Sequence, residues 1–382
     1  MSAQPIPTAT PSRLVSAALA DGEVVVTFAA GVTARFTPFW LRDHCHLPAS
    51  LNPDTLQRQV DTFSIPTGIA PARLAVAEEG RVLRATWAHD ESASEWPAEF
   101  LFEVAASSGR ERAPARTLWD REAMQGRFPT LAFSDVMASD SALRDWLSLV
   151  ETFGFALAVG APATTEATAA IARRVGYIRE TIFGGFWDFS ADLAFKDTAY
   201  TPVAIGPHTD GTYSIDSPGY QMFHCLQHDG TGGENTLVDG FKVADVIRRT
   251  DPAAYRTLTT VKVPAHYLGD GVHLRAEHEI IALDRDGEMR QVAYNNYDRA
   301  PFLLPAAEMK EFYRALALWD GLVNDPAYEV AFKLTPGTVL LFDNWRTLHG
   351  RRAYTGFRRL CGAYLNKEDF DSRRRVLHSA LR

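Results

Sequence analysis

Residues 336–350 read PGTVLLFDNWRTLHG, and this stretch decides the kind of fold to expect. A Pro-Gly turn opens it, and the apolar run from Pro336 to Leu348 has the composition of a buried strand. His349 follows at once, so the strand delivers an imidazole at its end. Strands of this kind joined by loops favour a β-rich core with flanking helices over a parallel doubly wound sheet.

The regions upstream divide by composition. Residues 105–115, AASSGRERAPA, are small, polar and charged, as expected of a linker. We therefore expect a small β-rich N-terminal domain over residues 1–112 and a second domain over 113–382. The expected strands of the first domain are Glu23–Phe28, Thr33–Phe36 and Arg81–Trp87, and the expected helices of the second are Ser141–Val150, Thr165–Arg174 and Asp369–Leu377.

The bulk composition excludes several classes of protein. The 382 residues are 46% hydrophobic and 23% charged, as in an ordinary globular chain. A net charge of -8 argues against nucleic-acid binding, and no apolar run is long enough for a membrane span. The N-terminus lacks the pattern of a secretory signal, and three scattered cysteines make no disulfide framework. These features predict a cytoplasmic protein.

The most informative short motif is His208-Thr209-Asp210. In an extended strand, residues i and i+2 project from one face, so the imidazole and the carboxylate would converge. His349 can supply a third ligand, although a lone His-x-Asp also arises by chance. Two histidines and one carboxylate leave three positions on a metal open, enough for a chelating 2-oxo acid and dioxygen, and Fe(II) suits that chemistry best.

Arg358 strengthens the metal hypothesis because it follows His349 by nine residues. If the chain runs back antiparallel after His349, the guanidinium can grip the distal carboxylate of 2-oxoglutarate through two parallel hydrogen bonds. Arg346 and Arg351 are second choices. A rival nucleophilic pair, His224-Cys225, is geometrically poor because adjacent strand residues point to opposite faces.

Further motifs surround these residues. They are Gly232-Gly233 before Leu237-Val238-Asp239-Gly240, Phe342 to Arg346 before His349-Gly350-Arg351, and residues 40–45 (WLRDHC). With them the chain resembles the gamma-butyrobetaine and trimethyllysine dioxygenases, a TauD-like family, over nearly its whole length. It resembles the trimethyllysine enzymes more closely in residues 179–184 (RETIFG), 197–201 (DTAYT), 295–300 (NNYDRA) and 355–362 (TGFRRLCG).

The resemblance implies a double-stranded β-helix (jelly-roll) catalytic domain preceded by the small N-terminal domain. It implies iron ligands His208, Asp210 and His349, with 2-oxoglutarate held by Arg358. The expected reaction is C3 hydroxylation of N6-trimethyl-L-lysine in carnitine synthesis, with succinate and CO2 as co-products. Fe(II), 2-oxoglutarate and O2 would be required, with ascorbate as reductant, and family members are commonly homodimers.

Two positions depart from the family pattern. Asn235 stands where the family has serine or threonine, which puts a 2-oxoglutarate contact from Asn235 in doubt. The butyrobetaine enzymes also carry a structural zinc site in the N-terminal domain, made of three cysteines and one histidine. Here Cys45 is followed by Leu47 and Ser50, leaving only His44, His46 and His89 as further ligands. A tetrahedral zinc site needs four, so we expect no structural zinc.

A trimethylammonium group is best recognised by aromatic faces through cation–π attraction. The family's cage positions correspond to Phe183, Trp187, Tyr200 and Tyr364, of which the first two would share a face of a helix. Asp197 could pair with the α-ammonium of trimethyllysine, which butyrobetaine lacks. Asn295 would face the amino-acid carboxylate.

Four alternatives stay open from the sequence. Gamma-butyrobetaine hydroxylation to L-carnitine is the nearest, followed by another quaternary amine. A cupin-like barrel with the same triad could bind metal without oxidation, although it would not need the arginine clamp. A structural or protein-interaction module would take up no metal at all.

Overall fold

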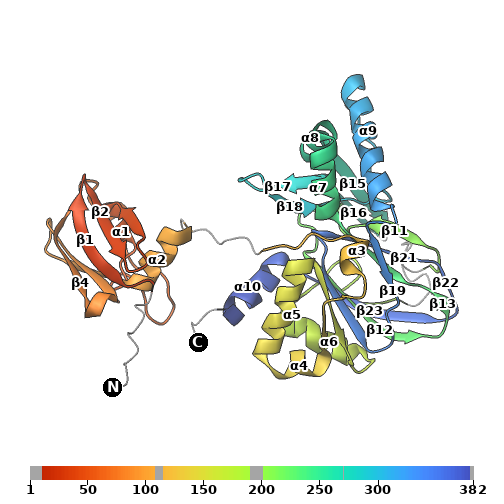
Figure 1. The fold of residues 1–382 in the computed structure, drawn as a ribbon, viewed down its shortest axis with the longest axis horizontal. Helices are drawn as coiled ribbons and strands as arrows, with labels where there is room; N and C mark the ends of the chain where they lie inside the picture. Colours follow the sequence, from red (N-terminus) through yellow and green to blue (C-terminus); the bar gives the residue numbers. More distant parts are fainter. Residues whose placement is uncertain (1–10, 108–114, 190–200, 270, 379–382) are drawn as a thin grey trace, which may run out of the picture. The chain divides into compact units, whose positions relative to one another are not determined.

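The computed structural model describes residues 11–107, 115–189, 201–269 and 271–378. The chain divides into two compact units, Met1–Ala113 and Pro114–Arg382 (Figure 1). Both units are built mainly from β-strands, with helices packed beside them. No helix in the described part of the chain is both long and apolar enough to cross a membrane.

The first unit contains two three-stranded antiparallel sheets around a core that includes Trp87 and Trp96. Positive φ angles at Asp21 and Gly22 make the tight turn of its first hairpin. The strands are β1 (Leu14–Ala20), β2 (Glu23–Phe28), β3 (Thr33–Phe36), β4 (Pro71–Ala77), β5 (Val82–Trp87) and β6 (Ala93–Pro97). The helices are α1 (Pro38–Asp43), α2 (Ala98–Ser107) and the short η1 (Thr62–Ser64) and η2 (Glu78–Gly80).

The second unit contains a seven-stranded and a four-stranded sheet. The larger runs β10 (Phe186–Phe189), β23 (Arg358–Leu365), β12 (Tyr220–His228), β20 (Thr338–Asp343), β8 (Phe155–Val159) and β7 (Thr130–Ala132), and β9 (Ile178–Arg179) pairs with β23. The smaller runs β11 (Ile205–His208), β21 (Thr347–Arg351), β14 (Asn235–Asp239) and β19 (Glu329–Phe332). Of these pairs only β7–β8 is parallel.

The two sheets pack face to face. Phe155, Leu340 and Phe342 of the larger sheet share one buried cluster with Leu237 and Val330 of the smaller. Alternate residues of the same strands, such as Ala156 and Leu341, point the other way, because strand side chains alternate between faces. Helices α4 (Phe133–Ala138), α5 (Asp140–Phe153), α6 (Thr165–Val175) and α10 (Lys367–His378) cover that outer face.

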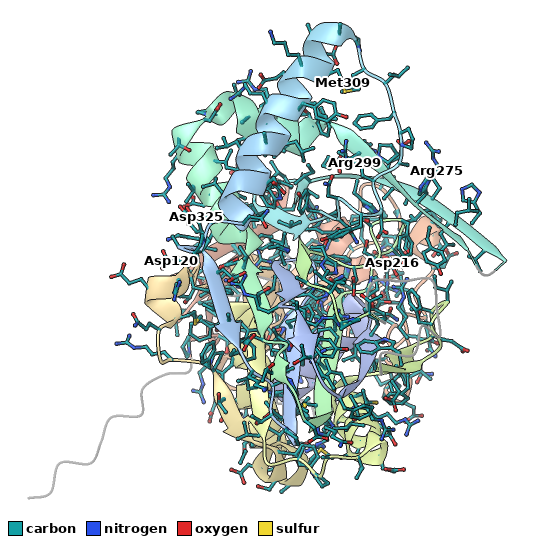
Figure 2. All side chains as sticks on the ribbon, turned by 90° about the vertical axis from the view of Figure 1, so that its right-hand side faces the viewer. Asp120, Asp216, Arg275, Arg299, Met309 and Asp325 are labelled. Atoms are coloured by element: carbon teal, nitrogen blue, oxygen red, sulfur yellow. The ribbon has the colours of Figure 1, made fainter. Side chains whose placement is uncertain are left out.

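A second group of helices forms its own core around Phe312 and Trp319. It contains α7 (Gly240–Thr250), α8 (Pro252–Thr260) and α9 (Ala306–Val323), beside the hairpins β15 (Lys262–Gly269)–β16 (Val272–Glu279) and β17 (Ile281–Leu283)–β18 (Met289–Val292). Figure 2 marks α9 by Met309 and the longer hairpin by Arg275. The remaining elements are α3 (Arg121–Met124), β13 (Thr231–Gly232) and β22 (Tyr354–Thr355).

Several local predictions were wrong. The stretch Pro336–Leu348 forms two strands, β20 and the start of β21, because Asn344 to Arg346 make a turn between them. Ala105 to Ser107 belong to α2 and not to a linker. Asp210 lies just beyond the end of β11, so it does not share a strand with His208. The first and third errors arise because polar residues end a strand, at Asn344 and after His208.

Candidate metal centre

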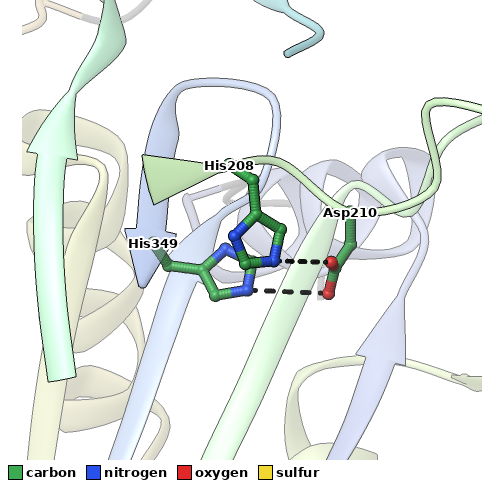
Figure 3. A group of neighbouring side chains, drawn as sticks. All are labelled: His208, Asp210 and His349. Atoms are coloured by element: carbon green, nitrogen blue, oxygen red, sulfur yellow. Dashed lines mark ion pairs between the residues drawn. The ribbon is translucent and has the colours of Figure 1, made fainter. Parts of the chain in front are cut away.

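The two histidines of the triad meet because their strands pair. His208 at the end of β11 lies opposite His349 in β21, in antiparallel register. Residues paired in this way project their side chains to the same face, and the two imidazole ring centres are 4.2 Å apart. Asp210 turns back toward both rings from the loop after β11 (Figure 3).

Asn344 holds the backbone of that loop. Its side-chain oxygen accepts a hydrogen bond from the backbone N–H of Asp210 at 2.8 Å, and its amide nitrogen donates to the Asp210 carbonyl at 3.0 Å. The same nitrogen donates to the carbonyl of Pro218 at 2.9 Å. The turn between β20 and β21 therefore places Asp210 as well as His349.

The donor atoms of the triad face one another. His208 Nδ1 lies 2.9 Å from the Gly206 carbonyl, which can only accept, so the neutral ring carries its proton on Nδ1. The lone pair of His208 Nε2 then faces Asp210 Oδ1 at 3.3 Å, and His349 Nε2 lies 3.7 Å from Asp210 Oδ2. Acceptors brought this close need a shared proton or metal ion between them.

The titration behaviour of the triad agrees with this geometry. Burial alone would raise the pKa of Asp210, but His349 and His208 together hold that pKa well below its usual range. Burial and the neighbouring His208 lower the pKa of His349 to about 3, so this ring is neutral and ready to bind a metal. Burial opposes a charged His208, yet Asp210 outweighs it and raises the pKa of His208.

Among the described residues, these three form the only group of at least three His, Cys, Asp or Glu side chains whose donor atoms lie within 4.8 Å of one another. Two imidazoles and one carboxylate on one side of an ion are the donor set of non-haem Fe(II) oxygenases. Two of the residues considered as zinc ligands in the first unit make local hydrogen bonds. The His44 ring bonds the Trp40 carbonyl oxygen, and Cys45 Sγ accepts from the backbone N–H of Leu47.

Arg358 enters the space between the sheets from the larger sheet. Its Nη2 donates to Asn235 Oδ1 of β14 at 2.8 Å, the single hydrogen bond that joins its guanidinium to a described residue. Asn235 and Leu237 share a face of β14, and Leu237 pairs with His349, so the clamp lies on the same face as the triad. Asn235 and Leu237 are two residues apart in the strand, which corresponds to about 7 Å.

The guanidinium of Arg358 is a buried cation without a carboxylate partner among the described residues. Burial, followed by the neighbouring Arg351, lowers the pKa of Arg358 to about 10. The Nδ2 of Asn235 is also buried and has no partner in the described part of the chain. Two donors thus converge on a place that an anion would fill.

The second-choice arginines are engaged elsewhere. Arg346 is fully buried and holds Asp239 through two parallel hydrogen bonds of 3.0 and 2.8 Å. Arg351 donates to the carbonyls of Thr201 and Val203, at 2.8 Å to the latter, and so fixes the approach to β11. Arg358 remains the candidate clamp.

The predicted cage residues fall into two groups. Trp187 of β10 and Tyr364 of β23 have ring centres 5.6 Å apart. Gly362 permits this contact, because a Cβ there would lie 2.1 Å from the Trp187 ring. Phe183 lies in a turn before β10, so the shared helical face was wrong, and its ring is 6.0 Å from that of Tyr267.

The remaining predicted substrate residues are Asp197, Tyr200 and Asn295. Asp197 and Tyr200 lie outside the described residues. Asn295 lines a pocket with Thr212, His278 and Arg299, but its amide donates to Asp298 at 2.8 Å and its oxygen accepts from the Tyr297 N–H. One amide proton of Asn295 is left for a ligand.

The structure adds contacts that the sequence did not suggest. Tyr364 donates its phenolic proton to Asp210 Oδ2 at 2.7 Å, and the Tyr213 ring contacts that of Tyr267 at a tilt of 46°, with ring centres 5.5 Å apart. The position of Asn344 between β20 and β21 could have signalled its role, since it shares a short motif with Arg346 and His349. His224 and Cys225 occupy one strand, and burial raises the pKa of the Cys225 thiol to about 11, so this pair is no nucleophile.

The model of the family described as "Taurine catabolism dioxygenase TauD, TfdA family" matches residues 113–364. The chain is 38% identical to the trimethyllysine dioxygenase of Meyerozyma guilliermondii, covering 94% of each chain. It is 36% identical to the trimethyllysine dioxygenase of Neurospora crassa over 88% of this chain and 79% of that protein. The gamma-butyrobetaine dioxygenase of Pseudomonas sp. strain AK-1 is 31% identical and 96% covered on both sides. The chain belongs to the TauD, TfdA family of dioxygenases.

Proposed function

We propose that this protein hydroxylates N6-trimethyl-L-lysine at C3, in an Fe(II)- and 2-oxoglutarate-dependent reaction that also yields succinate and CO2. The observation that supports it best is the buried guanidinium of Arg358, which lies on the face that carries the His208, Asp210 and His349 triad and has no carboxylate partner among the residues that the structure describes. A clamp for a dicarboxylate beside a facial triad is the requirement of this chemistry. Several relatives that bear the name trimethyllysine dioxygenase agree with it.

His208, Asp210 and His349 would hold the iron, each through one donor atom. Bound Fe(II) supplies the activation of dioxygen, coupled to oxidative decarboxylation of 2-oxoglutarate. Phe342 and Phe223 pack against the His349 ring at 4.8 and 5.8 Å between ring centres, and so limit water on that side of the triad. The two facing sheets would be the halves of a double-stranded β-helix.

Arg358 would bind the distal carboxylate of 2-oxoglutarate, leaving the 2-oxo acid end to reach the metal. Asn235 holds the guanidinium by its Oδ1 and has its Nδ2 free of described partners, so it can donate to the same carboxylate. Asn235, which bonds the clamp, and Leu237, the strand partner of His349, are about 7 Å apart along β14, a spacing that a five-carbon diacid can bridge. An asparagine can therefore replace the hydroxyl residue that the family uses here.

The cation of the substrate would lie against aromatic faces. Trp187 and Tyr364 form one aromatic corner next to Asp210, and Phe183 would add to it from the turn before β10. Asp197 and Tyr200, outside the described residues, would complete the site, with Asp197 pairing to the α-ammonium and Asn295 to the carboxylate. Cation–π attraction suits a trimethylammonium group, which cannot donate hydrogen bonds.

Gamma-butyrobetaine is the second candidate, because a relative of that name matches 96% of this chain at 31% identity. Asp197 argues for trimethyllysine, since an aspartate would face only the carboxylate end of butyrobetaine. A cytoplasmic location, a homodimer, a role for ascorbate and the lack of structural zinc stay predictions, and several animal relatives carry the word mitochondrial in their names.

The test is a single-turnover assay. The protein is loaded anaerobically with Fe(II) and 2-oxoglutarate, mixed with trimethyllysine, gamma-butyrobetaine or lysine, and exposed to oxygen. Mass spectrometry should show one added oxygen on trimethyllysine, matched by one succinate. Preferential hydroxylation of butyrobetaine would support the second candidate. Turnover without succinate, or turnover without metal, would contradict the proposed oxygenase activity.

Two variants sharpen this assay. Asp197→Asn should shift preference toward butyrobetaine, because it removes the charge that pairs with the α-ammonium. His349→Ala should abolish turnover, and His273→Ala, at an exposed position in β16, is the matched control. An unchanged substrate preference in Asp197→Asn would remove that residue from the proposal.

A further inference from the structure

Tyr364 contacts the metal-binding carboxylate as well as the aromatic corner. Its hydroxyl lies 2.7 Å from Asp210 Oδ2, and an ionised carboxylate can only accept, so the phenolic proton points at Asp210. Oδ1 of the same carboxylate faces His208 Nε2 at 3.3 Å. The two oxygens of Asp210 therefore have different surroundings, one held by a protein donor and one directed at the metal position.

Gln221 supports that hydroxyl from the neighbouring strand. Gln221 of β12 pairs with Tyr364 of β23, so both side chains lie on the same face of the larger sheet. Its Nε2 is 3.4 Å from the Tyr364 oxygen, and Gln221 is almost fully buried. Because the phenolic proton is used on Asp210, the phenolic oxygen can only accept, and this fixes the orientation of the Gln221 amide.

Within the described segments, few other groups hold the Asp210 side chain. Asp210 follows β11 outside any ladder, and Asn344 bonds only its backbone. Rotation about the side-chain bonds would let Oδ2 turn toward His349 Nε2, 3.7 Å away, or let both oxygens bind one ion. The hydrogen bond that Tyr364 donates to Oδ2 opposes both this rotation and the binding of one ion by both oxygens.

We propose that Gln221 and Tyr364 form a hydrogen-bonded relay that holds Asp210 as a one-oxygen ligand, so that both are positioning residues for the metal. This inference rests on the proposed iron site and deepens it. Tyr364 then has two separable roles, because its ring serves the aromatic corner and its hydroxyl serves Asp210. Removal of such an outer partner typically weakens metal binding by about 10- to 100-fold.

Tyr364→Phe separates the two roles, since it keeps the ring and deletes the hydroxyl. The metal-free full-length protein is titrated with Co(II), and the dissociation constant and the ligand-field absorption of bound Co(II) are recorded. We expect Tyr364→Phe to bind Co(II) about 10-fold more weakly with an altered spectrum. The KM for the trimethylated substrate should change little, because the ring remains.

Gln221→Leu should weaken Co(II) binding by about threefold, since its bond to Tyr364 is long. In the double variant with Tyr364→Phe, the loss should equal that of Tyr364→Phe alone, because Gln221 acts through the hydroxyl. Met222→Leu is the control, as this neighbouring buried residue of β12 faces the outer core. It should leave the Co(II) constant and the spectrum unchanged even if it lowers thermal stability.

The outcomes separate the two ideas. Wild-type affinity and spectrum in Tyr364→Phe would overturn the relay and leave the iron site intact. Losses that add in the double variant would also overturn it, because Gln221 would then act on the metal by another route. Failure of the wild-type protein to bind Co(II) at all would remove the iron site itself, and the relay with it.

Discussion

Two buried arginines close to His349 in sequence have opposite surroundings. Arg346 holds Asp239 by two hydrogen bonds and donates further to the carbonyls of Thr117 and Thr152, at 2.6 and 3.0 Å. Asp239 in turn accepts from two backbone N–H groups, those of Trp119 and Phe241. Arg358 has one hydrogen-bond partner among the described residues, the neutral Asn235, and its guanidinium lies over the Tyr354 ring, 5.6 Å from the ring centre.

The difference separates structure from function. A buried ion pair whose donors and acceptors are all used leaves no group for a ligand. A buried cation that contacts only neutral groups is costly in the ligand-free protein and is stabilised when an anion binds. We therefore infer that Arg346 is a structural tie between segments far apart in sequence, and that Arg358 belongs to the proposed 2-oxoglutarate site.

The largest effect is expected when the structural tie is cut. Arg346→Met leaves the Asp239 carboxylate buried without its partner, which should cost about 3–5 kcal/mol of unfolding free energy. In a unit of this size the melting temperature should fall by roughly 10 °C. Thermal and urea unfolding measure this, and the folded fraction should still bind 2-oxoglutarate. A fall of only a degree or two would contradict the structural role.

Arg358→Met should have the next largest effect, on binding and not on stability. Loss of the charged clamp should weaken 2-oxoglutarate binding by about 100-fold, roughly 3 kcal/mol, because the distal carboxylate loses its partner. Equilibrium binding to the metal-loaded protein without oxygen measures it. The melting temperature of the ligand-free protein should hold or rise, since an unpaired buried charge is gone. A large fall in the melting temperature would mean that Arg358 has a structural role, as Arg346 does.

The sequence suggests the candidate ligands more readily than the residues that position them. Imidazole, carboxylate and guanidinium groups are few, and their chemistry restricts what they can do together, so His208, Asp210, His349 and Arg358 could be selected from spacing and resemblance. Arg346 and Arg358 are the same residue type in the same stretch. Their roles differ because Arg346 pairs with the carboxylate of Asp239, which is more than a hundred residues away in sequence.

The fold shows the same division. The local sequence pattern predicts the bounds of β2, β3 and α6 closely, because turns and helical periodicity depend on residues that are near one another in sequence. It misses the break between β20 and β21, since Asn344 leaves the strand to bond Asp210 and Pro218, both distant in sequence. The relay from Gln221 through Tyr364 is missed for the same reason, as it depends on the pairing of β12 with β23.

His224 tests whether an unsatisfied buried atom is sufficient to mark a site. The ring is fully buried, with Nδ1 bonded to Thr168 Oγ1 at 2.8 Å and Nε2 without a partner in the described segments. Burial lowers the pKa of His224 to about 4. A neutral ring tolerates this setting, whereas an arginine cannot lose its charge, so we expect no ligand here.

The consequence is a pH dependence of stability. Between pH 6.5 and 4 the unfolded chain takes up a proton at His224 that the folded chain does not, so stability is lost as the pH falls through that window. The slope due to this group is at most about 1.4 kcal/mol per pH unit. His224→Gln should flatten the slope measured by urea unfolding, and exposed His273→Gln should not. An equal slope in all three proteins would contradict the assignment.

The smallest effect is expected at Arg359, the immediate neighbour of the clamp. Its guanidinium pairs with Asp188 of β10 at an exposed position, with hydrogen bonds of 3.0 Å to both carboxylate oxygens. Water screens such a pair, so Arg359→Met should cost at most about 1 kcal/mol and leave 2-oxoglutarate binding unchanged. The comparison of Arg359→Met with Arg358→Met in the same binding experiment removes the same residue type at adjacent positions. The two arginines differ mainly in burial. If both variants lost 2-oxoglutarate affinity equally, the effect would belong to the positive charge of β23 as a whole, and the distinction between a clamp and its neighbours would fail.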